Sequence, residues 1–242
     1  MREWNPVFSR VASHLRRLER HGCPDPFFRG HSDSTWKLLP EYGRLSLDRS
    51  IEDRLFAIFR SSGSYLLPVG STSWDILFSM RHHGLPTRLL DWSESFAVAL
   101  YFALRDATTR AAVWILNPYE LNKATIKYEA VPNLNDEYPS GYDSYFIDEG
   151  HENFKKFPAA IVAVEGSRAI ARMQWQRSVF TLHKNTKQPL EKLHPTAVTK
   201  IFIPQEVIPA AKEFLRIAGM NEFAAFPDLD GLARHLRETE LS

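Results

Sequence analysis

Residues 81–107 read RHHGLPTRLLDWSESFAVALYFALRDA. From Phe96 onward, apolar residues recur at helical intervals, and the small alanines among them would allow close packing against a neighbouring element. Asp91 precedes this run and Glu94 comes three residues after Asp91, which is the spacing of a capping box at a helix N-terminus. The stretch therefore predicts a well-packed helix that begins at Asp91 and ends near Ala107.

The flanking sequence alternates between helix and strand patterns and contains no internal repeat. Apolar residues at three- to four-residue spacing predict helices at 6–20, 48–60, 73–82, 205–218 and 228–238. Runs of β-branched and aromatic residues bounded by turn residues predict strands at 26–31, 111–116, 160–164, 179–183 and 198–203. Residues 131–157, rich in proline, glycine and asparagine, predict a long loop or lid.

These elements indicate the α+β class, and we expect a compact mixed sheet flanked by helices. No stretch resembles a flexible linker, so we expect a single domain over residues 1–242 with its core at about 24–235. The N-terminal helix at 6–20 and the C-terminal helices would pack on that core.

Composition narrows the classes of protein to consider. The 242 residues are 44% hydrophobic, which is typical of a globular protein. They carry 30 basic and 29 acidic side chains, so the chain lacks the excess of basic residues that a dedicated nucleic-acid-binding protein has. No apolar run approaches the roughly 20 residues that span a bilayer, and the N-terminal sequence lacks a secretory signal. A single cysteine, Cys23, excludes an internal disulfide framework. We therefore expect a cytoplasmic protein.

Common metal and catalytic motifs are missing from the sequence. The nine histidines include no pair at i and i+4, and one cysteine cannot form a thiolate cluster, so we expect no metal site. There is no Walker loop, no G-x-G-x-x-G and no G-x-S-x-G elbow. Cys23 is better explained as an ordinary thiol than as a nucleophile, because no local base accompanies it.

A first candidate site lies at the end of the strand expected at 26–31. Arg29 would be held rigidly there, beside Gly30, which permits close backbone approach. A fixed guanidinium binds phosphate or carboxylate through two hydrogen bonds. The alternative is a buried ion pair of Arg29 with Asp33 or Asp91.

A second candidate site is the polar segment at residues 81–93, between two expected helices. It leads into a helix N-terminus, where free backbone N–H groups and the helix dipole favour an anion. The alternative is that its hydroxyl and carboxylate groups cap helices and turns, with Arg88 paired to Asp91. The candidate ligand-binding residues of this segment are His83, Thr87, Arg88, Asp91, Trp92 and Ser93.

The two segments together resemble the FRG domain family. Phe28-Arg29-Gly30 followed by His-Ser-Asp resembles the opening of that domain, and His83 to Ser93 followed by Ala97 to Ala103 resembles its central motif. The resemblance extends over about residues 24–235. One departure is visible, since Gln176-Arg177-Ser178 stands where the family often has Gln-x-Gly.

A weaker resemblance is to the layout of ADP-ribosyltransferases. It implies that NAD is the substrate, with Arg29 holding its phosphates beside Gly30 and His31, and the Thr87–Ser93 segment ordering the nicotinamide half. Gln176 stands where the resemblance implies a catalytic glutamate, and Glu165 and Glu206 are other candidates for that role. It further implies a toxin or phage-defence effector that acts on an unidentified acceptor macromolecule.

Three functions are compatible with these observations. The first is an ADP-ribosyltransferase-like enzyme, with Arg29 and Gln176 as its catalytic residues. The second is a non-catalytic module that senses a nucleotide or phosphate in the same pocket. The third is a nucleic-acid-binding protein, suggested by the arginine-rich helix at 6–20 and opposed by the neutral overall charge.

Overall fold

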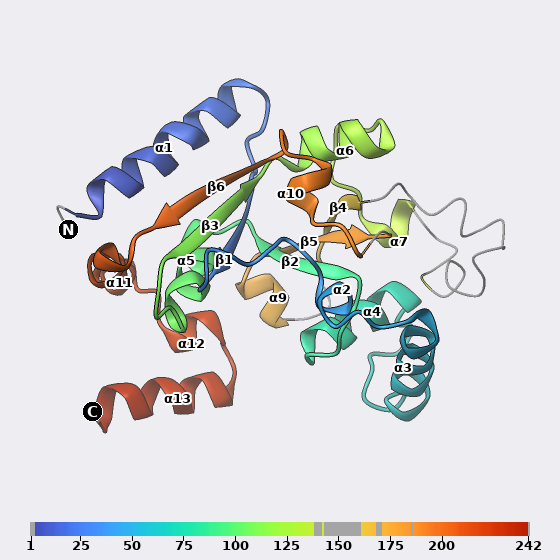
Figure 1. The fold of residues 1–242 in the computed structure, drawn as a ribbon. Helices are drawn as coiled ribbons and strands as arrows, with labels where there is room; N and C mark the ends of the chain where they lie inside the picture. The colour runs from blue at the N-terminus through green and yellow to red at the C-terminus, as the bar shows by residue number, and fades with distance from the viewer. Residues whose placement is uncertain (1–2, 138–141, 143–160, 168–170, 185, 242) are drawn as a thin grey trace.

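The computed structural model describes residues 3–137, 142, 161–167, 171–184 and 186–241 (Figure 1). Its six strands form one sheet in the order β4-β5-β2-β1-β3-β6. Every described strand pairing is antiparallel, so the α+β class is confirmed while the sheet is antiparallel rather than mixed. The strands are β1 (Phe27–His31), β2 (Leu89–Ser93), β3 (Ala111–Leu116), β4 (Ile161–Glu165), β5 (Ser178–His183) and β6 (Val198–Ile203).

Twelve α-helices and a 3-10 turn connect the strands within the described residues. Several lie within one or two residues of the sequence prediction, because their caps are local: Asp48 accepts hydrogen bonds from Ser50 N and Ile51 N. The helices are α1 (Asn5–Arg20), α2 (Glu41–Arg44), α3 (Arg49–Ser62), α4 (Ser73–His82), α5 (Phe96–Arg105), α6 (Pro118–Ile126), α7 (Leu134–Glu137), α9 (Ala171–Trp175), α10 (Leu190–Leu193), α11 (Ile208–Ile217), α12 (Glu222–Ala225) and α13 (Leu229–Glu240), and the 3-10 turn is η2 (Gln205–Val207).

The predicted helix start at Asp91 is wrong. Residues 89–93 form β2, which pairs with β5 along its whole length, and α5 begins only at Phe96. Ser95 is the N-cap residue, and its side chain accepts a hydrogen bond from Val98 N. Burial of Leu89, Leu90 and Trp92 in a central strand outweighs the local capping pattern.

Most of the loop or lid expected at 131–157 falls outside the described residues. Within the part that is described, Leu134–Glu137 forms the short helix α7. No described helix combines the length and the apolar character needed to cross a membrane.

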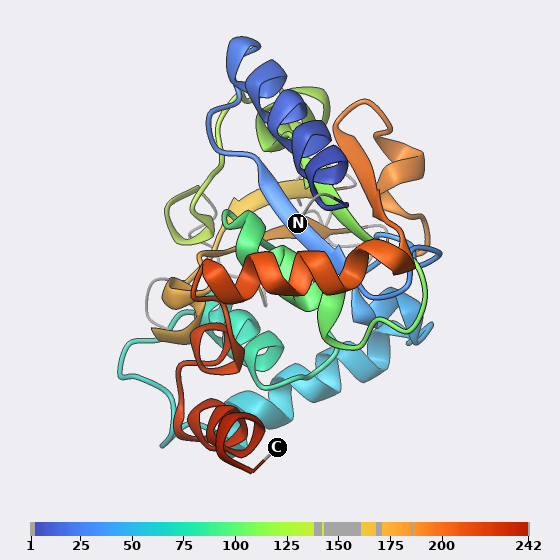
Figure 2. The same ribbon diagram turned by 90° about the vertical axis from the view of Figure 1, so that its left-hand side faces the viewer.

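Helices cover both faces of the sheet (Figures 1 and 2). On one face, α1, α5 and α11 pack over β1, β3 and β6, and α3 and α4 pack over β2, β4 and β5. On the opposite face, α6 and α10 contribute Leu121 and Leu190 to a third cluster. Alternate residues of one strand enter different clusters, as β4 shows with Val162 on the first face and Ile161 on the second.

Candidate functional site

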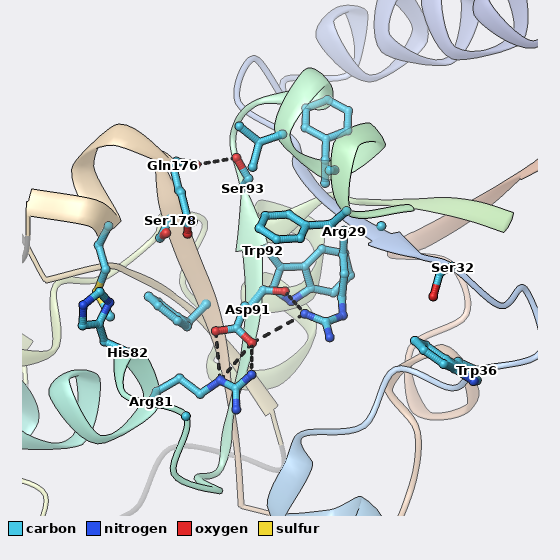
Figure 3. Close-up of a pocket in the computed structure, with 18 of the residues that line it drawn as sticks. Arg29, Ser32, Trp36, Arg81, His82, Asp91, Trp92, Ser93, Gln176 and Ser178 are labelled. Carbon is cyan, nitrogen blue, oxygen red and sulfur yellow. Dashed lines mark hydrogen bonds and ion pairs between the residues drawn. The ribbon is translucent and has the colours of Figure 1, made fainter. Parts of the chain in front are cut away.

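A cavity of about 410 Å³ opens where β1 meets β2. Its walls come from both strands, from α4 and α5, and from the segment that joins α9 to β5 (Figure 3). The polar and charged residues that line it are Arg29, Ser32, Arg81, His82, Asp91, Ser93, Asp106, Gln176 and Ser178. The two segments singled out in the sequence, about sixty positions apart, thus border one cavity.

The cavity exists because the sheet opens at this junction. β1 pairs with β3 at five positions, but its pairing with β2 consists of Phe28 opposite Ser93. Beyond that pair, Nη1 of Arg29 donates a hydrogen bond of 2.6 Å to the backbone oxygen of Asp91. The guanidinium therefore satisfies a strand carbonyl that a neighbouring strand would otherwise pair.

Asp91 is the centre of a charged cluster at the cavity wall (Figure 3). Nε of Arg81 lies 3.0 Å from each carboxylate oxygen of Asp91, and its Nη2 lies 2.8 Å from Oδ2. Nη1 of Arg29 lies 3.6 Å from the same Oδ2. Arg81 also donates from Nη1 to Glu41 at 2.6 Å, so α2, α4, β1 and β2 are joined through these four side chains.

The protonation states of the cluster follow from burial and neighbouring charge. Burial opposes ionisation of Asp91, but the guanidinium groups of Arg81 and Arg29 together outweigh it and hold the pKa of that carboxyl below its usual value. Burial lowers the pKa of Arg29 to about 10, opposed by Asp91, so the guanidinium stays charged at neutral pH. Burial, reinforced by Arg29, lowers the pKa of His31 to about 3, so this imidazole is neutral.

Arg29 keeps donors for a ligand. Its Nε donates to Nε2 of the neutral His31 at 3.2 Å, and its Nη1 is used by Asp91. No hydrogen bond joins its Nη2 to any residue that the structure describes. By contrast, Nε, Nη1 and Nη2 of Arg81 all contact Asp91 or Glu41. Of the two arginines, Arg29 is therefore the one with a donor left for an anion.

Aromatic and apolar side chains flank the charged cluster on two sides. Trp36, whose side chain is 51% exposed, lies on the Arg29 side in Figure 3. Gln176 and Ser178 lie on the opposite side of the cluster in Figure 3. Phe102 and Phe180 also line the cavity. The cavity lining thus combines aromatic side chains with a cluster of charged ones.

The FRG family model matches residues 25–112. The chain contains an FRG domain. No curated protein and no solved structure matches the chain, and the comparisons contain nothing that bears on the resemblance to ADP-ribosyltransferases. The FRG match includes β1, β2, α4 and α5, and therefore Arg29, Arg81 and Asp91, whereas Gln176 lies beyond it.

Within the FRG domain, Gly30 has a packing role. A Cβ at this position would lie 2.0 Å from the backbone oxygen of Ala99 and 2.5 Å from the backbone nitrogen of Ala103. Only glycine lets α5 approach β1 this closely. On this side of β1, the close approach that Gly30 permits is therefore made by α5 and not by a ligand.

Four predicted binding residues of the FRG domain do not line the cavity: His31, His83, Thr87 and Arg88. His31 instead accepts a hydrogen bond from Nε of Arg29 at 3.2 Å. His83 follows the last turn of α4, and Thr87 is buried with its hydroxyl accepting from Leu89 N at 3.3 Å. Arg88 pairs with buried Glu52, its Nε lying 2.8 Å from both carboxylate oxygens. The alternative in which Arg88 pairs with Asp91 is also wrong, because Arg88 precedes β2 and its guanidinium pairs with Glu52 of α3 instead.

Gln176 lines the cavity through an anchored loop. Its Nε2 donates to the backbone oxygen of Ala225 at 2.7 Å, and its backbone oxygen accepts from Ser93 Oγ at 2.7 Å. The left-handed backbone conformation in this loop falls on Arg177, with φ of 47°, and not on Ser178, where the family often has glycine. The departure from Gln-x-Gly therefore places no strain at Ser178.

Sequence reasoning missed some residues of this cavity between β1 and β2, which we call the FRG cavity. Arg81 stood in the quoted segment without a role, Phe102 lay in the family's central motif without a role, and Asp106 had no motif to mark it. The two glutamates considered as catalytic candidates, Glu165 and Glu206, do not line this cavity. Among the described residues, no group of three or more potential metal ligands comes together.

Proposed function

We propose that the FRG cavity binds NAD and that the protein transfers ADP-ribose from it. The observation that carries this proposal is that the lining of one cavity combines aromatic side chains with a pair of arginines. A dinucleotide such as NAD presents both kinds of partner, a heterocycle at each end and a diphosphate between them. Aromatic walls stack on heterocycles, and guanidinium groups bind phosphate oxygens.

The charge balance of the cavity fits NAD better than a polyphosphate. Arg29 and Arg81 are offset by Asp91 and Asp106, so the lining carries both signs of charge in equal number. NAD carries two negative charges on its diphosphate and one positive charge on its nicotinamide ring. A lining with both signs can match both, whereas a triphosphate nucleotide would need a net positive cavity.

The reaction would break the bond between nicotinamide and ribose. Positive charge develops on the ribose as this bond breaks, so a fixed dipole or carboxylate near the ribose lowers the barrier. The proposal gives this role to the amide oxygen of Gln176, because its amide nitrogen is already held by Ala225. Arg29 would anchor the diphosphate and so fix the ribose relative to that group.

A second candidate function is nucleotide sensing without turnover. It is favoured by the cavity's uncharged Gln176 and by Asp91, whose carboxylate is already neutralised by Arg81. Under this reading the same residues bind NAD, and no nicotinamide is released.

Titration calorimetry with NAD tests the binding proposal on the wild type, Arg29→Lys and the control Arg17→Ala, which removes an exposed arginine of α1. We expect Arg29→Lys to weaken binding at least ~10-fold, since a lost charge-assisted hydrogen bond costs about 1.5–3 kcal/mol. The control should bind like the wild type. Wild-type protein that binds no NAD at millimolar concentration would refute the proposal.

Chromatographic detection of free nicotinamide separates the two candidate functions. Release of nicotinamide by the wild type supports the transferase, and tight binding with no release supports the sensor. A thermal-shift titration on the same samples confirms that each variant is folded, because a ligand that binds the native state raises its stability.

A further inference from the structure

The helix α5 separates two cavities. Val98 and Phe102 line the FRG cavity, whereas Tyr101 and Arg105 line a second cavity of about 570 Å³ formed with α11, α12 and α13. Asp106, which directly follows α5, lines both. Among the described residues it is the one side chain that the two cavities share. A group bound in either cavity can therefore reach its carboxylate.

The carboxylate of Asp106 differs from the other carboxylates near it. Asp91 is held by Arg81, and Glu222 in the second cavity is buried and accepts hydrogen bonds from Tyr101 and Arg234. Asp106 is exposed, and no hydrogen bond or ion pair joins its side chain to another residue that the structure describes. Its oxygens are thus available to accept a proton.

The position of Asp106 in the helix is unfavourable for stability. It is the C-cap residue of α5, at the negative end of the helix dipole, where an acidic side chain is repelled and a basic one such as Arg105 is favoured. No local contact among the described residues offsets this repulsion. A residue that lowers the stability of its own helix in this way is typical of functional positions.

We propose that Asp106 is the catalytic base that deprotonates the acceptor where the two cavities meet. This role rests on the proposed function. The acceptor would approach from the second cavity and NAD from the first. As the bond between nicotinamide and ribose breaks, nicotinamide leaves with the bonding electron pair, a lone pair of the acceptor forms the new bond to the ribose carbon, and the acceptor proton passes to Asp106.

The test uses NAD with two small acceptors, water and azide. Water must lose a proton during the reaction, whereas azide is already an anion and needs no base. Nicotinamide release is measured in the wild type, Asp106→Asn, Asp106→Ala and the control Glu19→Gln, which alters an exposed carboxylate of α1. In water we expect both Asp106 variants to fall about 100-fold or more below the wild type.

Azide identifies the reason for that loss. It should restore nicotinamide release in Asp106→Ala and produce ADP-ribosyl azide. A loss that azide does not repair, or a wild-type rate in both Asp106 variants, would overturn the role of Asp106. So would a wild type that binds NAD and releases no nicotinamide. Absence of NAD binding is a distinct result, which overturns the proposed function and this role with it.

Discussion

Replacement of Gly30 by alanine gives a direct measure of how α5 and β1 are packed. The added Cβ would lie 2.0 Å from the backbone oxygen of Ala99 and 2.5 Å from the backbone nitrogen of Ala103. Neither atom can rotate away as a side chain would, so the helix must move off the strand. Overpacking a core costs about 1–3 kcal/mol and more where backbone must shift, so we expect about 3 kcal/mol or more.

For a chain of this length, 3 kcal/mol corresponds to a fall in melting temperature of roughly 6–12 °C. Thermal unfolding followed by circular dichroism measures it. The control is Gly70→Ala, where no atom lies within 4 Å of the added Cβ but φ is 84°. Only the backbone penalty of about 1–2 kcal/mol applies there. If Gly30→Ala melted within about 2 °C of the wild type, the packing argument would be refuted.

Three further predictions address the cavity, the core and the pH dependence. Trp36→Ala should weaken NAD binding about 10-fold in calorimetry, because stacking on one base contributes about 1–3 kcal/mol. Its melting temperature should change little, since Trp36 is exposed. The control Tyr65→Ala, which alters an exposed aromatic residue outside the cavity lining, should bind NAD like the wild type. Glu52→Gln should lower the free energy of unfolding in urea by about 3–5 kcal/mol, because it leaves the buried arginine partner uncompensated. Burial lowers the pKa of His31 and of His183 to about 3, so only the unfolded chain binds their protons as the pH falls below about 6.5. Each should therefore reduce the unfolding free energy at pH 5 by about 2 kcal/mol relative to pH 7, and the double variant His31→Asn/His183→Asn should show a flatter pH profile in the same urea experiment.

The fold could be predicted wherever local pattern and tertiary contact agree. The strand predicted at 111–116 is β3, and its buried residues alternate between two clusters. The helix predicted at 73–82 is α4, which starts with a capping box between Thr72 and Asp75. Asp91 and Glu94 present a similar local pattern, but pairing of β2 with β5 decides the structure there. Local sequence does not distinguish the two cases, because the partner strand lies almost ninety residues further on.

The site could be predicted in part for the same reason. Arg29 was identified from its place at the end of a strand, and it makes the contact with Asp91 that one alternative gave it; it also lines a cavity, while its binding of a ligand stays a prediction. The partner of Arg88 could not be predicted, because Glu52 is 36 positions earlier and no motif connects them. Asp106 could not be identified either, because its significance depends on two cavities that meet only in the folded chain.

The single backbone pair between β1 and β2 has a mechanical consequence. It divides the sheet into two three-stranded ribbons, each with its own apolar cluster on the face that carries α5 and α4. The seam between the ribbons is the most compliant line in the sheet, and it runs along the cavity. A ligand that binds Arg29 on one ribbon and β2 on the other would connect the two ribbons across this seam. We expect such a ligand to make the whole sheet more resistant to twisting.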